Sequence, residues 1–117
     1  MTKIVLRIDF DDERYIGHGR IELLELIGER GSIAKAAAAM GMSYKRAWYL
    51  IDEFSCVFSE PLVERRHGGK GGGSARLTPF GAELVERYRD MEAKAMTHFA
   101  KQIKPIEKRL ARRAKRT

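Results

Sequence analysis

The first residues of the chain alternate between apolar and polar side chains, with the period of two that a half-buried strand requires. The apolar face of this strand consists of Ile4, Leu6, Ile8 and Phe10. A polar turn over residues 11–14 follows, and Tyr15-Ile16 can return as a second short strand. The pattern therefore predicts a strand over residues 3–10 before the helices begin.

Two helices are predicted next, from apolar positions that lie three and four residues apart. Residues 21–27 carry the first apolar stripe, and Gly31 follows as a typical C-terminal cap. The alanine-rich segment 33–40 predicts a slim second helix that lets a neighbouring helix approach closely. Ser32 is the candidate N-cap of this second helix.

A third helix is predicted over residues 44–58, because its apolar side chains fall on one face. Gly41 breaks the chain before this helix, and Ser43 is its candidate N-cap. Trp48 is expected on the inner side of the helix, in the core. Pro61 prevents the helix from continuing further.

A two-stranded hairpin with a glycine-rich tip is predicted after the third helix. Residues 62–66 and 75–77 have the pattern of strands, and the glycine-rich segment 67–74 between them cannot pack a core. Thr78 and Pro79 then begin the final helix, with Thr78 as its cap and Pro79 in the first helical position.

The final helix carries an apolar stripe too long for a domain of this size to cover alone. Its positions, spaced by three or four residues, are Leu84, Tyr88, Met91, Ala95, Phe99 and Ile103. We expect part of this stripe to form a dimer interface with a second copy of the chain. Pro105 should end or kink the helix, which predicts a domain over residues 1–104 and a basic, flexible tail over residues 105–117.

The order of these elements predicts a fold that is mainly α with a small β component. It is a winged helix-turn-helix with an N-terminal strand and a long C-terminal dimerisation helix. In the turn, Ala37 and Ala47 keep the two helices close together, and Gly41 supplies the backbone freedom. This geometry projects the first turn of the second helix of the motif, the recognition helix, into a DNA major groove.

Candidate DNA-binding residues lie on this helix, on the hairpin, which is the wing, and at the preceding N-cap. The recognition helix offers Ser43, Tyr44, Lys45, Arg46 and Tyr49. The wing offers Arg65, Arg66 and Lys70, whose cations suit phosphates better than bases. Ser32 completes the set, because the free amides of a capped helix can hold a phosphate. The alternatives are a solvated helix face for Lys45 and Arg46, and packing for the two tyrosines.

The charge distribution favours an anionic partner. Of the 117 residues, 23 are Lys or Arg and 16 are Asp or Glu, which gives a net charge of +7. Residues 101–117 alone hold eight basic residues and one acidic residue. This segment can be a solvated end, an additional DNA-binding arm or a docking site for a partner, and the sequence leaves the three open.

Several other classes of protein are disfavoured. No apolar run approaches the roughly 18–20 residues that span a membrane, and the first residues lack a signal peptide, so we expect a cytoplasmic protein. The single cysteine, Cys56, excludes an internal disulfide, and we expect it to be a buried structural thiol. The glycine-rich segment lacks the spacing of a nucleotide-binding loop, and the three histidines lie far apart. We therefore predict no metal, no cofactor and no enzyme activity.

Three segments of the chain resemble the N-terminal DNA-binding domain of the ModE-type molybdate-responsive transcription regulators. They are Gly31-Ser32-Ile33, Ser43-Tyr44-Lys45-Arg46-Ala47-Trp48, and the stretch from Leu62 through the GGKGGG wing to Gly81. The resemblance covers about residues 4–95, and the turn alone is shared more loosely with LysR-type regulators. It implies a dimeric protein that binds double-stranded DNA at a near-palindromic operator and usually represses molybdate-uptake or molybdenum-enzyme genes. In that family the recognition helix and the wing touch DNA. The resemblance implies the same role here for Ser43, Tyr44, Lys45 and Arg46 on the helix and for Arg65, Arg66, His67, Lys70 and Arg76 on the wing.

Molybdate-sensing members of that family carry further C-terminal oxyanion-binding domains, whereas this sequence continues only into its basic tail. We therefore assign no oxyanion site and expect a homodimeric, sequence-specific transcription regulator. One alternative is an interaction protein that pairs with a separate sensor subunit or with a full-length relative. Another is a protein that coats DNA without sequence preference. The sequence leaves open the operator, the sensed ligand, and whether transcription is repressed or activated.

Overall fold

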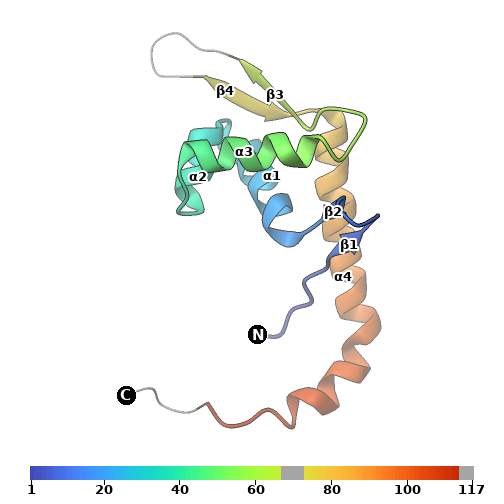
Figure 1. The fold of residues 1–117 in the computed structure, drawn as a ribbon. Helices are drawn as coiled ribbons and strands as arrows, with labels where there is room; N and C mark the ends of the chain where they lie inside the picture. Colours follow the sequence, from blue (N-terminus) through green and yellow to red (C-terminus); the bar gives the residue numbers. More distant parts are fainter. Residues whose placement is uncertain (67–72, 114–117) are drawn as a thin grey trace.

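Figure 1 shows the computed structural model of the chain, which describes residues 1–66 and 73–113. Within these residues, four helices and two small antiparallel sheets follow one another along the chain. The predicted fold class, mainly α with a small β component, is confirmed, and the elements have the order of a winged helix-turn-helix. No helix among the described residues is both long enough and apolar enough to cross a lipid bilayer.

The N-terminal strand is shorter than predicted. Strand β1 (Ile8–Asp9) pairs antiparallel with β2 (Tyr15–Ile16), and Ile8 lies opposite Ile16. The predicted alternation over residues 4–9 is present, with the even-numbered side chains turned inward. The backbone of residues 4–7, however, runs beside the last helix instead of pairing with a second strand (Figure 1).

Helices α1 (His18–Arg30), α2 (Ile33–Ala39) and α3 (Tyr44–Ser55) pack around one apolar core. The side chains in this core that are wholly or almost wholly inaccessible to solvent include Ile21, Leu24, Ile27, Ala36, Ala37, Ala47, Phe54 and Leu62. Gly31 ends α1 in the left-handed conformation, with φ of 72°. Glycine accepts this conformation without the steric cost that other residues meet there, as the sequence predicted.

The end of α3 corrects two predictions. The helix stops at Ser55 and not at residue 58, because the amides of Val57 and Phe58 bond to carbonyls only three residues back, which tightens the chain into a turn. Phe58 lies in this turn and not in the helix, and its partly buried ring packs against the core. The second correction concerns Cys56, which caps the helix and is exposed, so it is not a buried thiol.

The wing consists of β3 (Val63–Arg66) and β4 (Ser74–Leu77), which pair antiparallel with Val63 opposite Leu77. The wing is joined to the body of the domain through β4, because the amide of Ala75 donates to the carbonyl of Gly31 at 2.9 Å. The side chain of Ala75 is buried against the core. The contact with the end of α1 therefore fixes the position of the wing relative to the helices.

Helix α4 (Pro79–Glu107) is the longest element, and it passes from the base of the wing to the opposite end of the molecule (Figure 1). The hydroxyl of Thr78 accepts a hydrogen bond from the amide of Gly81 at 2.9 Å, which confirms the predicted cap. The helix continues through Pro105, where an end or a kink was predicted. Proline removes one backbone donor there, but the helix stops two residues later, so only its final turn is affected.

Candidate nucleic-acid interface

The first turn of α3 presents a row of exposed polar side chains. Ser43 accepts a hydrogen bond from the amide of Arg46 at 3.1 Å, which fixes where the helix begins. Tyr44, Lys45 and Arg46 are exposed, and so is Tyr49 in the next turn. The alternative of packing is therefore wrong for both tyrosines, whose side chains are 54% and 61% accessible.

The tight turn between α2 and α3 holds this row away from the core. Ala37 and Ala47 are almost completely buried where the two helices meet, as predicted. Gly41 has φ of 68°, and the amide of Met42 donates to the carbonyl of Ala37 at 3.0 Å, which closes the turn. Because Ala47 faces inward, Lys45 and Arg46, which come two residues and one residue before it, point away from the core.

The wing contributes exposed cations beside the recognition helix. Arg65 and Arg66 are exposed on β3. Arg76 is exposed on β4, but its Nε atom lies 2.8 Å from a carboxylate oxygen of Glu64, its partner across the wing. This ion pair partly neutralises Arg76, whereas no ion pair between described residues involves Arg65 or Arg66. The other predicted wing contacts, His67 and Lys70, lie outside the residues that the structure describes.

A groove of about 360 Å³ separates the wing from the first turns of α2 and α3. The polar residues that line it are Ser32, Lys35, Tyr44, Arg65, Arg66 and Ser74, and none of the lining residues is acidic. The structure thus brings together predicted residues from the N-cap, the recognition helix and the wing. A groove with three cations and two hydroxyl-bearing serines is suited to a phosphate backbone.

Lys35 and Ser74 also line this groove, although neither is among the DNA-binding residues predicted from the sequence. The amide of Lys35 donates to the hydroxyl of Ser32 at 2.9 Å, so the lysine belongs to the first turn of α2. A basic residue three positions after a predicted N-cap was a usable signal, because the first turn of the first helix of such a motif lies near the DNA backbone. Ser74 gave no comparable signal, since its place depends on the register of the wing.

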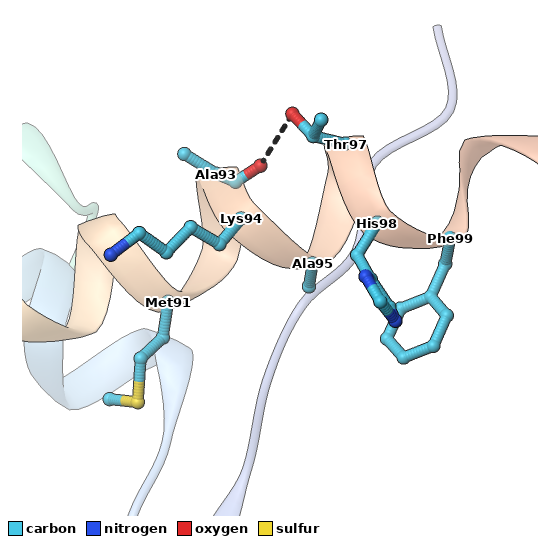
Figure 2. A pocket seen from close by; sticks show the side chains of 7 residues that line it. All are labelled: Met91, Ala93, Lys94, Ala95, Thr97, His98 and Phe99. Carbon is cyan, nitrogen blue, oxygen red and sulfur yellow. Dashed lines mark hydrogen bonds between the residues drawn. The ribbon is translucent and has the colours of Figure 1, made fainter.

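The residues of the predicted dimer interface on α4 differ in their exposure to solvent. Leu84 and Tyr88 are buried in the core of the chain itself, so they are not available to a partner. Met91 and Phe99 are 37% and 43% exposed, and Ala95 and Ile103 are partly buried. Figure 2 shows the side chains of Met91, Ala95 and Phe99 on one side of the helix. A hollow of about 680 Å³ runs along this stretch.

A recognition helix held by a tight turn beside a basic two-stranded wing defines a winged helix-turn-helix DNA-binding domain. The family of bacterial regulatory helix-turn-helix proteins of the lysR type has a sequence model that matches residues 19–82. The chain belongs to this family.

Comparison with curated proteins shows which regulators the chain is similar to. The chain is 40% identical over 87 residues to the transcriptional regulator ModE of Yersinia pestis, a match that covers 74% of this chain and 33% of the relative. It is 41% identical over 93 residues to the molybdenum transport protein ModE of Azotobacter vinelandii, covering 78% of the chain and 34% of the relative.

The DNA-binding transcriptional dual regulator ModE of Escherichia coli K12 is 41% identical over 87 residues, which cover 74% of the chain and 33% of the relative. The predicted resemblance to ModE-type regulators is therefore confirmed. The chain spans about a third of the length of these relatives.

Proposed function

We propose that this chain is a sequence-specific DNA-binding transcription regulator that acts as a homodimer. The observation that carries the proposal is the groove, where the exposed first turn of α3 meets two wing arginines and Lys35. These side chains come from three elements and converge on one face without an acidic neighbour among the lining residues. Such a face attracts a polyanion and also offers side chains that distinguish bases.

The roles of the residues follow from their chemistry. Lys45 and Arg46 stand at the start of the recognition helix and donate to guanine edges or to phosphates in the major groove. Arg65, Arg66 and Lys35 line the groove beside the helix, where the sugar–phosphate backbone passes, and they position the domain on the duplex. We thus assign base recognition to α3. The groove residues are assigned the contacts with the sugar–phosphate backbone that fix the position of the domain along the duplex.

The homodimer is proposed from the exposed face of α4. Met91, Ala95 and Phe99 form an apolar strip that the described part of the chain covers only in part. A second copy of the chain has the identical strip, so a two-fold pairing buries both strips at once. Two recognition helices related by this axis then reach successive major grooves roughly 34 Å apart, which requires a near-palindromic operator.

The printed names of several relatives link them to molybdenum transport or molybdenum-pterin binding. We extend this link to the genes that the chain regulates, and we place those genes among the ones that serve the uptake or use of molybdenum. No molybdate-binding role is assigned to the chain.

The test is a selection of DNA by the purified protein. Fragmented genomic DNA is retained on the protein near physiological salt and then sequenced. We expect a shared near-palindromic motif upstream of a small number of genes. Retention without a shared motif would instead establish a protein that coats DNA, and absence of retention would exclude autonomous DNA binding.

The alternative of an interaction protein uses the same strip on α4. A separate sensor subunit or a full-length relative with a matching strip can replace the second copy of the chain. Purified protein that stays monomeric, fails to retain DNA, and regains retention when a ModE-type relative is added would favour that alternative over the homodimer.

A further inference from the structure

The guanidinium of Arg65 lies over the indole ring of Trp48, with its central carbon 4.9 Å from the ring centre. Trp48 is on the recognition helix, and Arg65 is on the wing, so this contact joins the two elements that face DNA. Among the ion pairs between described residues, none involves Arg65, whereas Arg76 on the neighbouring strand pairs with Glu64. The stacking on the indole is therefore the side-chain contact that the structure shows for the Arg65 guanidinium.

The geometry of β3 turns Arg65 toward the helix. Side chains alternate along a strand, so Val63 and Arg65 share one face while Glu64 and Arg66 share the other. Val63 and Arg65 accordingly line a small hollow against α3, together with Trp48, Ile51, Asp52 and Ser55. Arg65 also lines the larger groove on the side of Tyr44, so its side chain reaches from the flank of α3 to the candidate DNA-binding surface.

The wing thus has two separate attachments to the body of the domain. Strand β4 is attached to the end of α1 by the hydrogen bond between Ala75 and Gly31. Strand β3 is attached to α3 by the contact between Arg65 and Trp48. Trp48 comes three residues after Lys45, so this second attachment lies about one helical turn from the start of α3, where Lys45 and Arg46 are proposed to read bases.

We propose that Trp48 is a positioning residue for DNA binding, because its indole face holds the guanidinium of Arg65 where that group meets a backbone phosphate. The inference rests on the proposed function, and it assigns the effect of Trp48 to Arg65 and not to a base contact. A guanidinium that lies over a ring keeps its N–H edge free to donate to a phosphate. Because the arginine is already ordered before binding, less side-chain entropy is lost when the complex forms.

The first test needs no DNA, because Trp48 is the single tryptophan of the chain and its fluorescence reports on the contact alone. In the Arg65→Ala variant we expect acrylamide to quench the emission more strongly and the emission to shift to longer wavelength, since the indole becomes more exposed to water. The matched control is Arg66→Ala, which removes a cation from the opposite face of the same strand and should leave both quantities unchanged. Equal quenching in wild type and Arg65→Ala would overturn the proposal.

The second test measures the coupling of the two residues in DNA binding, on a motif recovered by the selection. Arg65→Ala should lower the salt dependence of log affinity by roughly two units, because each subunit of the proposed dimer loses one phosphate contact. Trp48→Leu should weaken binding about five- to thirtyfold, the factor that two cation–π contacts of about 0.5–1 kcal/mol each, one per subunit of the proposed dimer, represent. In the Arg65→Ala background, Trp48→Leu should cause no further loss, whereas its effect should persist in full in the Arg66→Ala background.

Trp48→Phe keeps an aromatic face and should restore most of the affinity lost in Trp48→Leu, which separates positioning from a general loss of packing. If Trp48→Leu weakens binding equally in the presence and absence of Arg65, the two residues act independently and the proposal fails. A wild-type protein that shows no sequence preference would contradict the proposed function instead, and the fluorescence comparison would still decide whether Trp48 holds Arg65.

Discussion

Helix α4 packs closely against the base of the wing, where Gly81 contacts the backbone of Leu62. A Cβ atom added at Gly81 would lie 2.2 Å from the carbonyl oxygen of Leu62, which is far inside van der Waals contact. Leu62 is completely buried, and the carbonyl of Pro61 accepts a hydrogen bond from the hydroxyl of Thr78 at 2.7 Å. The backbone on both sides of this contact is therefore held in place and cannot move aside easily.

We expect Gly81→Ala to lower the free energy of unfolding by about 1–3 kcal/mol, the usual cost of overfilling a packed site. The measurement is urea unfolding followed by circular dichroism. The matched control is Gly19→Ala in α1, where an added Cβ meets nothing within 4 Å. That substitution should raise stability by about 0.5–1 kcal/mol, because alanine is the better helix former. Equal effects at the two sites would contradict the described packing.

The element that holds the N-terminal segment in place is α4. The hydroxyl of Tyr88 donates to the carbonyl of Leu6 at 2.7 Å, and its ring is completely buried. Burial, and next the nearby carboxylate of Glu92, raise the pKa of Tyr88 above its ordinary value. A raised pKa in the folded state means that folding favours the neutral phenol, so its contribution is full below pH ~10 and is lost as the pH rises further.

Tyr88→Phe keeps the ring and removes the hydroxyl, so we expect a loss of about 0.5–1.5 kcal/mol in the free energy of unfolding at neutral pH. The difference from wild type should shrink as the pH rises above ~10. Tyr49→Phe, at an exposed position on α3, serves as the control and should change stability by less than about 0.5 kcal/mol. A difference between Tyr88→Phe and wild type that stays constant up to strongly alkaline pH would show that the hydroxyl is not the cause.

Local rules predicted the elements whose determinants lie close together in the sequence. The three caps at Ser32, Ser43 and Thr78 each use the hydroxyl and an amide three residues later, and all three are confirmed. The turn at Gly41 is likewise determined by residues that are close together in the sequence. Such features can be predicted because backbone geometry and short-range hydrogen bonds determine them.

Features that depend on distant partners were predicted less well. Residues 4–7 have the pattern of a strand, but their polar backbone groups turn to α4, about ninety positions away in the case of Ile4 and Met96. The contact between Trp48 and Arg65, and the place of Ser74 in the groove, likewise require knowledge of how the wing stands against α3. Tertiary packing of this kind cannot be deduced from periodicity.

At the scale of the whole molecule, we propose that the exposed face of α4 determines the oligomeric state. Phe99→Glu places a charge in the proposed apolar interface, so we expect a monomer where wild type is a dimer, with unchanged helical content. Sedimentation equilibrium measures this directly. Ala100→Glu adds the same charge at an exposed position one residue later, outside the apolar strip, and should leave the dimer intact. Dimers that persist in Phe99→Glu would move the interface elsewhere.

The central claim is that the first turn of α3 reads base sequence, and a competition binding experiment tests it most directly. The affinity of wild type for the selected motif is compared with that for a scrambled duplex, and the comparison is repeated for Lys45→Ala plus Arg46→Ala. Lys101→Ala plus Lys104→Ala removes two exposed cations of α4 as the control. We expect wild type and control to prefer the motif by about 10³-fold or more, and the α3 variant to lose most of that preference while remaining dimeric. An α3 variant that discriminates as well as wild type would contradict the account.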